Sequence, residues 1–208
     1  MHRMIAAVLF DFGGVMAEEG FREGLFAIGR KNSLEPERFF GIVDDIIYES
    51  GYLIGRTGET NFWDRVRKGT GISGSDSELR KEILVRFLLR ADMITSVDLL
   101  RSRGINVSLL SDQTNWLEEI DHRTALFGHF DRIFNSYRIH KSKRDASIFR
   151  DVCGVLGVKP GEALFVDDNI EHIHRARGQG LQTIHFKSID DYKEQIGRID
   201  IFGNYCGS

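Results

Sequence analysis

The stretch IAAVLFDFGGV, residues 5–15, decides the interpretation of the fold, because its apolar run ends abruptly at Asp11 with two glycines close behind. The run from Met4 to Phe10 is too short for a membrane-spanning helix and has no small-residue cleavage site of a leader peptide. We therefore predict a β-strand that is buried on both faces. Taken alone, Asp11 would be interpreted as a turn-forming residue.

Four further apolar runs alternate with helical patterns along the chain. With the first run, they cover residues 5–10, 105–110, 132–135, 163–166 and 182–186. Thr95 with Asp98 predicts the start of a helix that Gly104 ends, and Asp145 and Gly157 delimit another. Strands that alternate with helices are typical of an α/β fold, so we predict a Rossmann-like parallel sheet sandwiched by helices.

The segment between the first two predicted strands contains helical patterns and no convincing strand. Three amphipathic stripes follow Pro36, Thr60 and the capping pattern from Ser75 to Glu78. We predict an all-helical cap domain at residues 17–92, inserted into an α/β core domain made of residues 1–16 and 93–208. A chain of 208 residues agrees with one core domain that carries a large insertion.

The composition excludes several classes of protein. The 28 basic and 31 acidic residues give a net charge of −3, which argues against a protein that wraps nucleic acid or binds membranes through a basic surface. The two cysteines, Cys153 and Cys206, are too few for a disulfide framework. We therefore expect a cytoplasmic protein, with no nucleic-acid or membrane partner.

Reactive side chains follow the predicted strands, at the edge of the sheet where ligands bind in open α/β folds. Asp11 follows the first strand, Ser111 and Asp112 the second, and Asp167 and Asp168 the fourth. Each of these residues also has a structural explanation, because serine and aspartate cap helices and form turns. Caps alone do not explain why all of these strands end in such groups.

The motifs resemble those of the haloacid dehalogenase-like hydrolases, most of which are magnesium-dependent phosphatases. These motifs are DFGGV at Asp11, LLSD at Ser111, KRD at Lys143 and FVDDN at Asp167. Lys143 taken alone would be part of a solvated basic loop. However, its spacing from Ser136, Asp145, Ile148 and Phe149 also matches the family's phosphatase-like members. The predicted helical insertion resembles the family's helical cap.

The resemblance implies a Mg²⁺ site. Asp11 would be the nucleophile that forms an aspartyl-phosphate and also a metal ligand, Asp168 the second carboxylate ligand with Asp167 beside it, and Gly13 would offer its backbone carbonyl. Phosphate monoesters are anionic and slow to hydrolyse, so a carboxylate nucleophile needs a cation between itself and the substrate. Mg²⁺ prefers this kind of oxygen ligand.

The resemblance also implies a binding site for the phosphoryl group of a small phosphorylated metabolite. Ser111 would donate a hydrogen bond to that group, and Lys143 would pair with both the phosphate and Asp11. Asp112 and Gly14 complete the expected substrate-binding residues. Asp112 stands where the family commonly has asparagine, and Arg144 replaces a common proline.

Gly13 is the main departure from the family pattern. The family's phosphatases usually have an aspartate there, which acts as general acid and base. Its absence predicts a preference for esters whose leaving group needs little protonation, such as anomeric sugar, acyl or aryl phosphates. Glu18, Glu19 and His172 are the candidates for a replacement acid.

Two other functions stay open at this point. Gly13 favours a catalytically weakened binding or regulatory protein that keeps the fold, and the nucleophile alone would also serve a dehalogenase that acts on carbon. The paired carboxylates favour a cation site and hence the phosphohydrolase. Substrate specificity would come from cap residues such as Arg22, Tyr52, Arg56 or Trp63. The sequence determines neither the substrate nor the oligomeric state.

Overall fold

The computed structural model describes residues 4–199, which form an α/β fold around one parallel sheet. The strand order is β3-β2-β1-β4-β5, and all neighbouring strands are parallel. The strands are β1 (Ala7–Phe10), β2 (Asn106–Ser111), β3 (Arg132–Asn135), β4 (Ala163–Asp167) and β5 (Gln182–His185). The predicted fold class is therefore confirmed, with strand ends within two residues of those expected.

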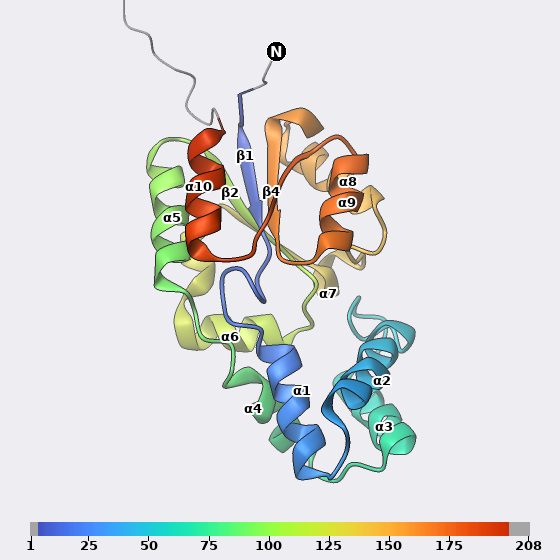
Figure 1. Ribbon diagram of the computed structural model, residues 1–208. Helices are drawn as coiled ribbons and strands as arrows, with labels where there is room; N and C mark the ends of the chain where they lie inside the picture. The colour runs from blue at the N-terminus through green and yellow to red at the C-terminus, as the bar shows by residue number, and fades with distance from the viewer. Residues whose placement is uncertain (1–3, 200–208) are drawn as a thin grey trace, which may run out of the picture.

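Both faces of the sheet are buried, which explains why its strands are apolar without alternation. In β1, Leu9 packs into one apolar cluster while Val8 and Phe10 pack into another on the opposite face. Helices α5 (Ala91–Ser102) and α10 (Ile189–Arg198) cover one face, and α8 (Ser147–Leu156) and α9 (Ile170–Gly178) cover the other (Figure 1).

Four helices lie beyond the carboxyl ends of the strands (Figure 1). They are α1 (Gly20–Lys31), α2 (Pro36–Glu49), α3 (Glu59–Thr70) and α4 (Asp76–Leu84). Three of them follow the predicted stripes, and the capping box of Ser75 and Glu78 is confirmed. Helix α1 was not predicted.

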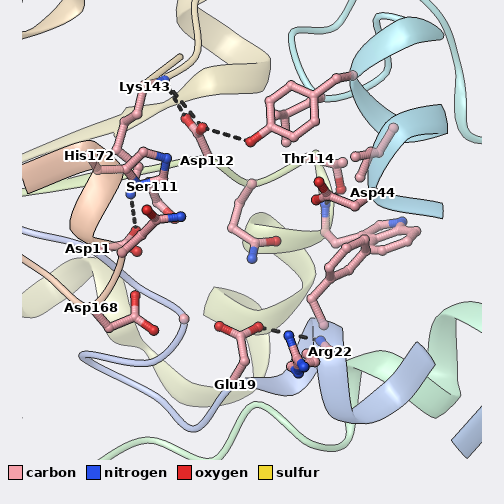
Figure 2. Close-up of a pocket in the computed structure, with 18 of the residues that line it drawn as sticks. Asp11, Glu19, Arg22, Asp44, Ser111, Asp112, Thr114, Lys143, Asp168 and His172 are labelled. Atoms are coloured by element: carbon pink, nitrogen blue, oxygen red, sulfur yellow. Dashed lines mark hydrogen bonds and ion pairs between the residues drawn. The ribbon is translucent and has the colours of Figure 1, made fainter. Parts of the chain in front are cut away.

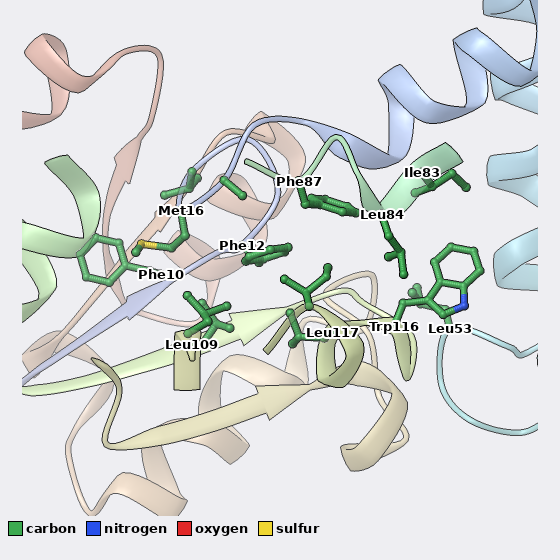
Figure 3. Packing of buried hydrophobic residues seen from close by; sticks show 14 of the residues in the cluster. Phe10, Phe12, Met16, Leu53, Ile83, Leu84, Phe87, Leu109, Trp116 and Leu117 are labelled. Carbon is green, nitrogen blue, oxygen red and sulfur yellow. The ribbon is translucent and has the colours of Figure 1, made fainter. Parts of the chain in front are cut away.

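One apolar cluster runs from the sheet into these helices. Phe12, which follows β1, lies against Phe87 with ring centroids 5.1 Å apart, and Leu84, Trp116 and Leu53 continue the cluster (Figure 3). Helix α6 (Trp116–Thr124) contributes the indole. Because this packing is continuous, the division into a core of residues 1–16 and 93–208 and a cap of residues 17–92 stays a prediction.

The structure corrects one predicted helix start and excludes the alternative in which Ser111 is a helix cap. Helix α5 begins at Ala91, and Thr95 lies inside it, where its hydroxyl donates to the Ala91 carbonyl. Helix α6 begins after Asn115, so Ser111 does not cap it. In both cases the buried apolar residues, and not the nearest capping residue, set the helix boundary.

The remaining connections are short. Helix α7 (Ser136–Ile139) follows β3 directly, and the 3₁₀ turns η1 (Leu126–His129) and η2 (Pro160–Glu162) precede β3 and β4. Residues 4–199 include no helix that is long and apolar enough to cross a membrane. Cys153 is a buried free thiol, whereas Cys206 lies outside the described residues.

Candidate active site

The carboxyl ends of the three central strands meet at one edge of the sheet. Strand β1 lies between β2 and β4, so Asp11 sits between Ser111 at the end of β2 and Asp167 at the end of β4. The Asp11 backbone N–H donates to the Val166 carbonyl at 2.9 Å and continues the pairing of the two strands. This point, where the strand order reverses, is where ligands bind in such sheets.

A buried ammonium group joins two carboxylates at this edge. The Lys143 Nζ lies 2.7 Å from Asp11 Oδ1 and 2.6 Å from Asp167 Oδ2, and the exposed fractions of the lysine, Asp11 and Asp167 side chains are 1%, 12% and 0%. Burial would lower the pKa of Lys143, but the charges of Asp11 and Asp167 outweigh burial and raise it. The lysine is therefore a permanent cation.

Asp167 has partners on both of its oxygens. Besides Lys143, it accepts from the Asn169 backbone N–H at 2.7 Å, and the His172 Nδ1 lies 3.2 Å from its Oδ2. Burial alone would raise the pKa of Asp167, but Lys143 and His172 hold it at about 2. Asp167 thus positions Lys143, and both of its carboxylate oxygens already have hydrogen-bond partners within the protein.

Asp11, Asp167 and Asp168 could together approach a metal ion. Each of them offers an oxygen atom, and these oxygens lie within 4.8 Å of one another. Burial raises the pKa of Asp11 well above its usual range, and burial together with Asp167 raises that of Asp168. One lysine therefore does not balance the negative charge, and the donor set fits a hard divalent cation.

Gly14 allows the close approach of Asp168. Its φ is +76°, and a Cβ built on it would lie 2.1 Å from Asp168 Oδ2. Its carbonyl accepts from the Arg90 guanidinium at 2.7 Å. Gly14 does not line the pocket described below, and its lack of a side chain makes room for the Asp168 carboxylate; its expected contact with substrate stays a prediction.

Gly14→Ala should therefore weaken metal binding by more than its backbone strain explains. Gly71→Ala is the matched control, because Gly71 has a φ of +74° and nothing within 4 Å of its Cβ position. Both variants should lose about 1–2 kcal/mol of stability for the left-handed backbone. In urea denaturation and Mg²⁺ titration calorimetry, Gly14→Ala alone should lose further stability and Mg²⁺ affinity. Equal behaviour of the two variants would contradict the assigned role.

Asp112 holds the backbone at Lys143 in place. Its carboxylate accepts from the Lys143 backbone N–H at 2.9 and 3.2 Å, from the Ser136 hydroxyl at 2.5 Å and from the Tyr48 hydroxyl at 3.3 Å. Tyr48 comes from α2, so this aspartate also connects that helix to the sheet. Asp112 lines the pocket, but its oxygens already have protein donors.

A pocket opens from the carboxylate cluster towards α1 and α2 (Figure 2). Its volume is about 260 Å³, which suits a small molecule. Asp11, Gly13, Ser111, Lys143 and Asp168 line its inner end. The outer part is lined by Glu19, Phe21, Arg22, Phe40, Asp44, Ile47, Tyr48, Leu53, Asp112, Gln113, Thr114, Trp116, Asn169 and His172.

The residues expected to confer specificity are distributed unevenly. Arg22 lines the pocket, whereas Tyr52 and Trp63 are buried in the apolar cluster and Arg56 is exposed outside it. Three further lining residues were not expected from the sequence: Phe40, Asp44 and Tyr48, which lie four residues apart on one face of α2. This spacing, next to the buried stripe of the same helix, was the available signal.

The three candidates for a replacement acid differ in their exposure and in their partners. Glu18 is exposed and pairs with the Arg90 guanidinium at 3.0 Å, and the Nδ1 of His172 faces Asp167. Only Glu19 both lines the pocket and has no cationic side chain within ion-pair distance among residues 4–199. Burial and the charge of Asp168 raise the pKa of Glu19 to about 7.

Sequence comparison places the chain among hydrolases. A family model described as haloacid dehalogenase-like hydrolase matches residues 5–178. Bifunctional epoxide hydrolase 2 of Rattus norvegicus is 26% identical over 117 residues, which are 53% of this chain and 21% of that protein. The match thus spans about a fifth of that relative's length.

Structure comparison finds the same fold in enzymes of this family. A family member from Bacteroides thetaiotaomicron, in complex with magnesium and inorganic phosphate, has a TM-score of 0.71 and 24% identity over 88% of this chain and 94% of that one. The L-2-haloacid dehalogenase of Xanthobacter autotrophicus, with chloropropionic acid covalently bound, has a TM-score of 0.64 and 22% identity over 94% and 84%.

Proposed function

The chain belongs to the haloacid dehalogenase-like hydrolases, and from this premise we propose that it is a magnesium-dependent phosphohydrolase that acts on a small phosphorylated metabolite. The observation that carries the proposal is the buried Lys143 ammonium, held between Asp11 and Asp167 at the inner end of the pocket. A permanent cation beside a carboxylate and a candidate metal site suits a substrate that is itself an anion.

Asp11 is the proposed nucleophile. Its carboxylate oxygen attacks phosphorus, the bond to the leaving oxygen breaks, and water later releases phosphate from the aspartyl-phosphate. Lys143 holds the attacked group and Asp11 together, while Ser111 donates a hydrogen bond to a phosphoryl oxygen. Asp167 takes no part in the bond changes and keeps the lysine in position through its 2.6 Å contact.

Asp11, Asp168 and the Gly13 carbonyl are the proposed ligands of Mg²⁺. When bound, this ion supplies positive charge that offsets the repulsion between the carboxylates and an anionic substrate. The raised pKa values of Asp11 and Asp168 support this assignment, because a divalent cation would stabilise both ionised carboxylates.

The proposed function predicts metal-dependent hydrolysis of p-nitrophenyl phosphate. Turnover should disappear in a chelator and return with Mg²⁺, and Asp168→Asn should require far more Mg²⁺ to reach half its maximal rate. Asp151→Asn is the control, because Asp151 is an exposed partner of Lys141. No turnover across a broad panel of phosphate esters would contradict the proposal and favour a binding protein, whereas release of halide from haloacids would favour a dehalogenase.

A further inference from the structure

The position of the Glu19 carboxyl points to a catalytic role that the motifs do not assign. A Cβ built on Gly13 would lie 3.3 Å from Glu19 Oε2 and 3.7 Å from Oε1. The glutamate carboxyl therefore fills the space that a side chain at position 13 would enter. It lines the pocket next to Asp168, at the edge nearest α1 (Figure 2).

Other proton-carrying groups along the pocket are already engaged. Lys143 is bound to two carboxylates, and the Asp112 carboxylate accepts from three donors. Asp44, in the outer part of the pocket, pairs with the Arg144 guanidinium at 3.0 Å. The Tyr48 hydroxyl donates to Asp112. His172, through its Nδ1, faces Asp167.

Glu19 is held in place by both the backbone and its apolar surroundings. It is the N-cap of α1, where its Oε1 accepts from the Arg22 backbone N–H at 3.4 Å. The Phe87 ring lies 3.5 Å from the Cβ position of Gly13 and closes the same space. Oε1 therefore fixes the side chain, and Oε2 is the oxygen on the Gly13 side.

We propose that Glu19 is the general acid and base of the hydrolase, in place of the carboxylate that position 13 lacks. This proposal rests on the phosphohydrolase function proposed above. As Asp11 forms its bond to phosphorus, the bond from phosphorus to the leaving oxygen breaks, and that oxygen takes the proton of the Glu19 carboxyl. The resulting carboxylate then takes a proton from the water that attacks phosphorus, and the electron pair of the breaking bond returns to Asp11.

This assignment changes the expected choice of substrate. Without an acid, only esters with good leaving groups should be hydrolysed well. With Glu19 as the acid, alkyl phosphates become substrates too, and the dependence of kcat/KM on the leaving group should be shallow. The value of kcat/KM reports events up to formation of the aspartyl-phosphate, so it isolates the step in which the leaving oxygen is protonated.

The test compares wild type with Glu19→Gln on a series of esters from p-nitrophenyl phosphate to simple alkyl phosphates. Glutamine keeps an oxygen that can accept from the Arg22 N–H, so the helix cap is retained. We expect kcat/KM to fall about 10²- to 10⁴-fold for alkyl phosphates and to change little for p-nitrophenyl phosphate. Glu18→Gln, the matched control on an exposed neighbour, should leave the leaving-group dependence unchanged.

A second pair of variants covers the case in which the substitution disturbs the fold. Glu19→Ala empties the space beside Gly13, and adding Gly13→Asp to it places a new carboxyl there. Gly13 is not among the residues with positive φ, so an L-residue fits its backbone. The double variant should recover at least about tenfold of the activity on alkyl phosphates that Glu19→Ala loses.

The outcomes separate the two proposals. If wild type hydrolyses no phosphate ester, the proposed function fails. If wild type is active but Glu19→Gln lowers kcat/KM by one common factor for all leaving groups, the function stands and Glu19 is only a helix cap. Failure of Gly13→Asp to restore any alkyl phosphate turnover in the Glu19→Ala background would likewise overturn the role of Glu19.

Discussion

Asp11→Asn should abolish phosphate ester hydrolysis without unfolding the protein. Asparagine has nearly the same shape but cannot act as the nucleophile, so we expect kcat/KM to fall by at least about 10⁴-fold. Burial raises the pKa of Asp11, which means that its ionised form destabilises the metal-free fold at neutral pH. The neutral variant should therefore match or exceed wild type in urea denaturation with a chelator.

Asp11→Asn thus separates catalysis from stability. Mg²⁺ should stabilise wild type against urea and stabilise the variant much less, because one of the two proposed carboxylate ligands is gone. Retention of metal-dependent turnover by the variant would contradict the assignment of Asp11. A large loss of stability in the chelator would contradict the cause assigned to its raised pKa.

Lys143→Met should be the most destabilising single substitution in the site. It leaves the fully buried Asp167 carboxylate and the largely buried Asp11 carboxylate without the cation that they share. Removing one partner of a buried ion pair typically costs about 3–5 kcal/mol. Lys141→Met is the matched control, because Lys141 pairs with exposed aspartates, and it should cost less than about 1 kcal/mol.

The loss caused by Lys143→Met should also depend on pH. The pKa of Asp167 is about 2 in the folded protein, below that of an unfolded aspartate near 3.9, so its stabilising contribution is present at neutral pH and lost as the pH falls towards 2. Without Lys143 this carboxyl becomes easier to protonate. Urea denaturation should therefore show a smaller difference from wild type near pH 4 than at pH 7; an equal or larger difference would contradict the ion-pair assignment.

The sheet could be predicted because both of its faces are covered. Apolar runs such as residues 163–166 need no context to be recognised as buried strands, and the polar residue after each run marks the strand end. The parallel order then brings Asp11, Ser111 and Asp167 together without further information. The inner end of the site was therefore accessible from the sequence.

Helix α1 could not be predicted because its glycines oppose local helix propensity. A Cβ on Gly20 would lie 2.6 Å from the Phe87 ring, and one on Gly24 would lie 2.5 Å from the Ile83 Cα. The glycines permit close packing against α4 and the segment after it. Such a requirement exists only in the tertiary structure.

The outer part of the site could not be predicted from the sequence either, because it also depends on tertiary packing. Asp44 and Tyr48 lie on α2, far along the chain from Asp112 and Arg144, and only the docking of this helix brings them together. Choosing among Glu18, Glu19 and His172 also required distances. The motif position of Gly14 suggested substrate contact, and only its φ and its proximity to Asp168 reveal that the missing side chain makes room for that carboxylate.

The most direct test of the account is the mass of the protein during turnover. Wild type mixed with Mg²⁺ and excess p-nitrophenyl phosphate is quenched in acid, digested and examined by mass spectrometry. We expect one phosphoryl group, on Asp11 of the wild type, and none in Asp11→Asn. A phosphoryl group on another residue, or steady turnover by wild type with no phosphorylated Asp11 at any quench time, would contradict it.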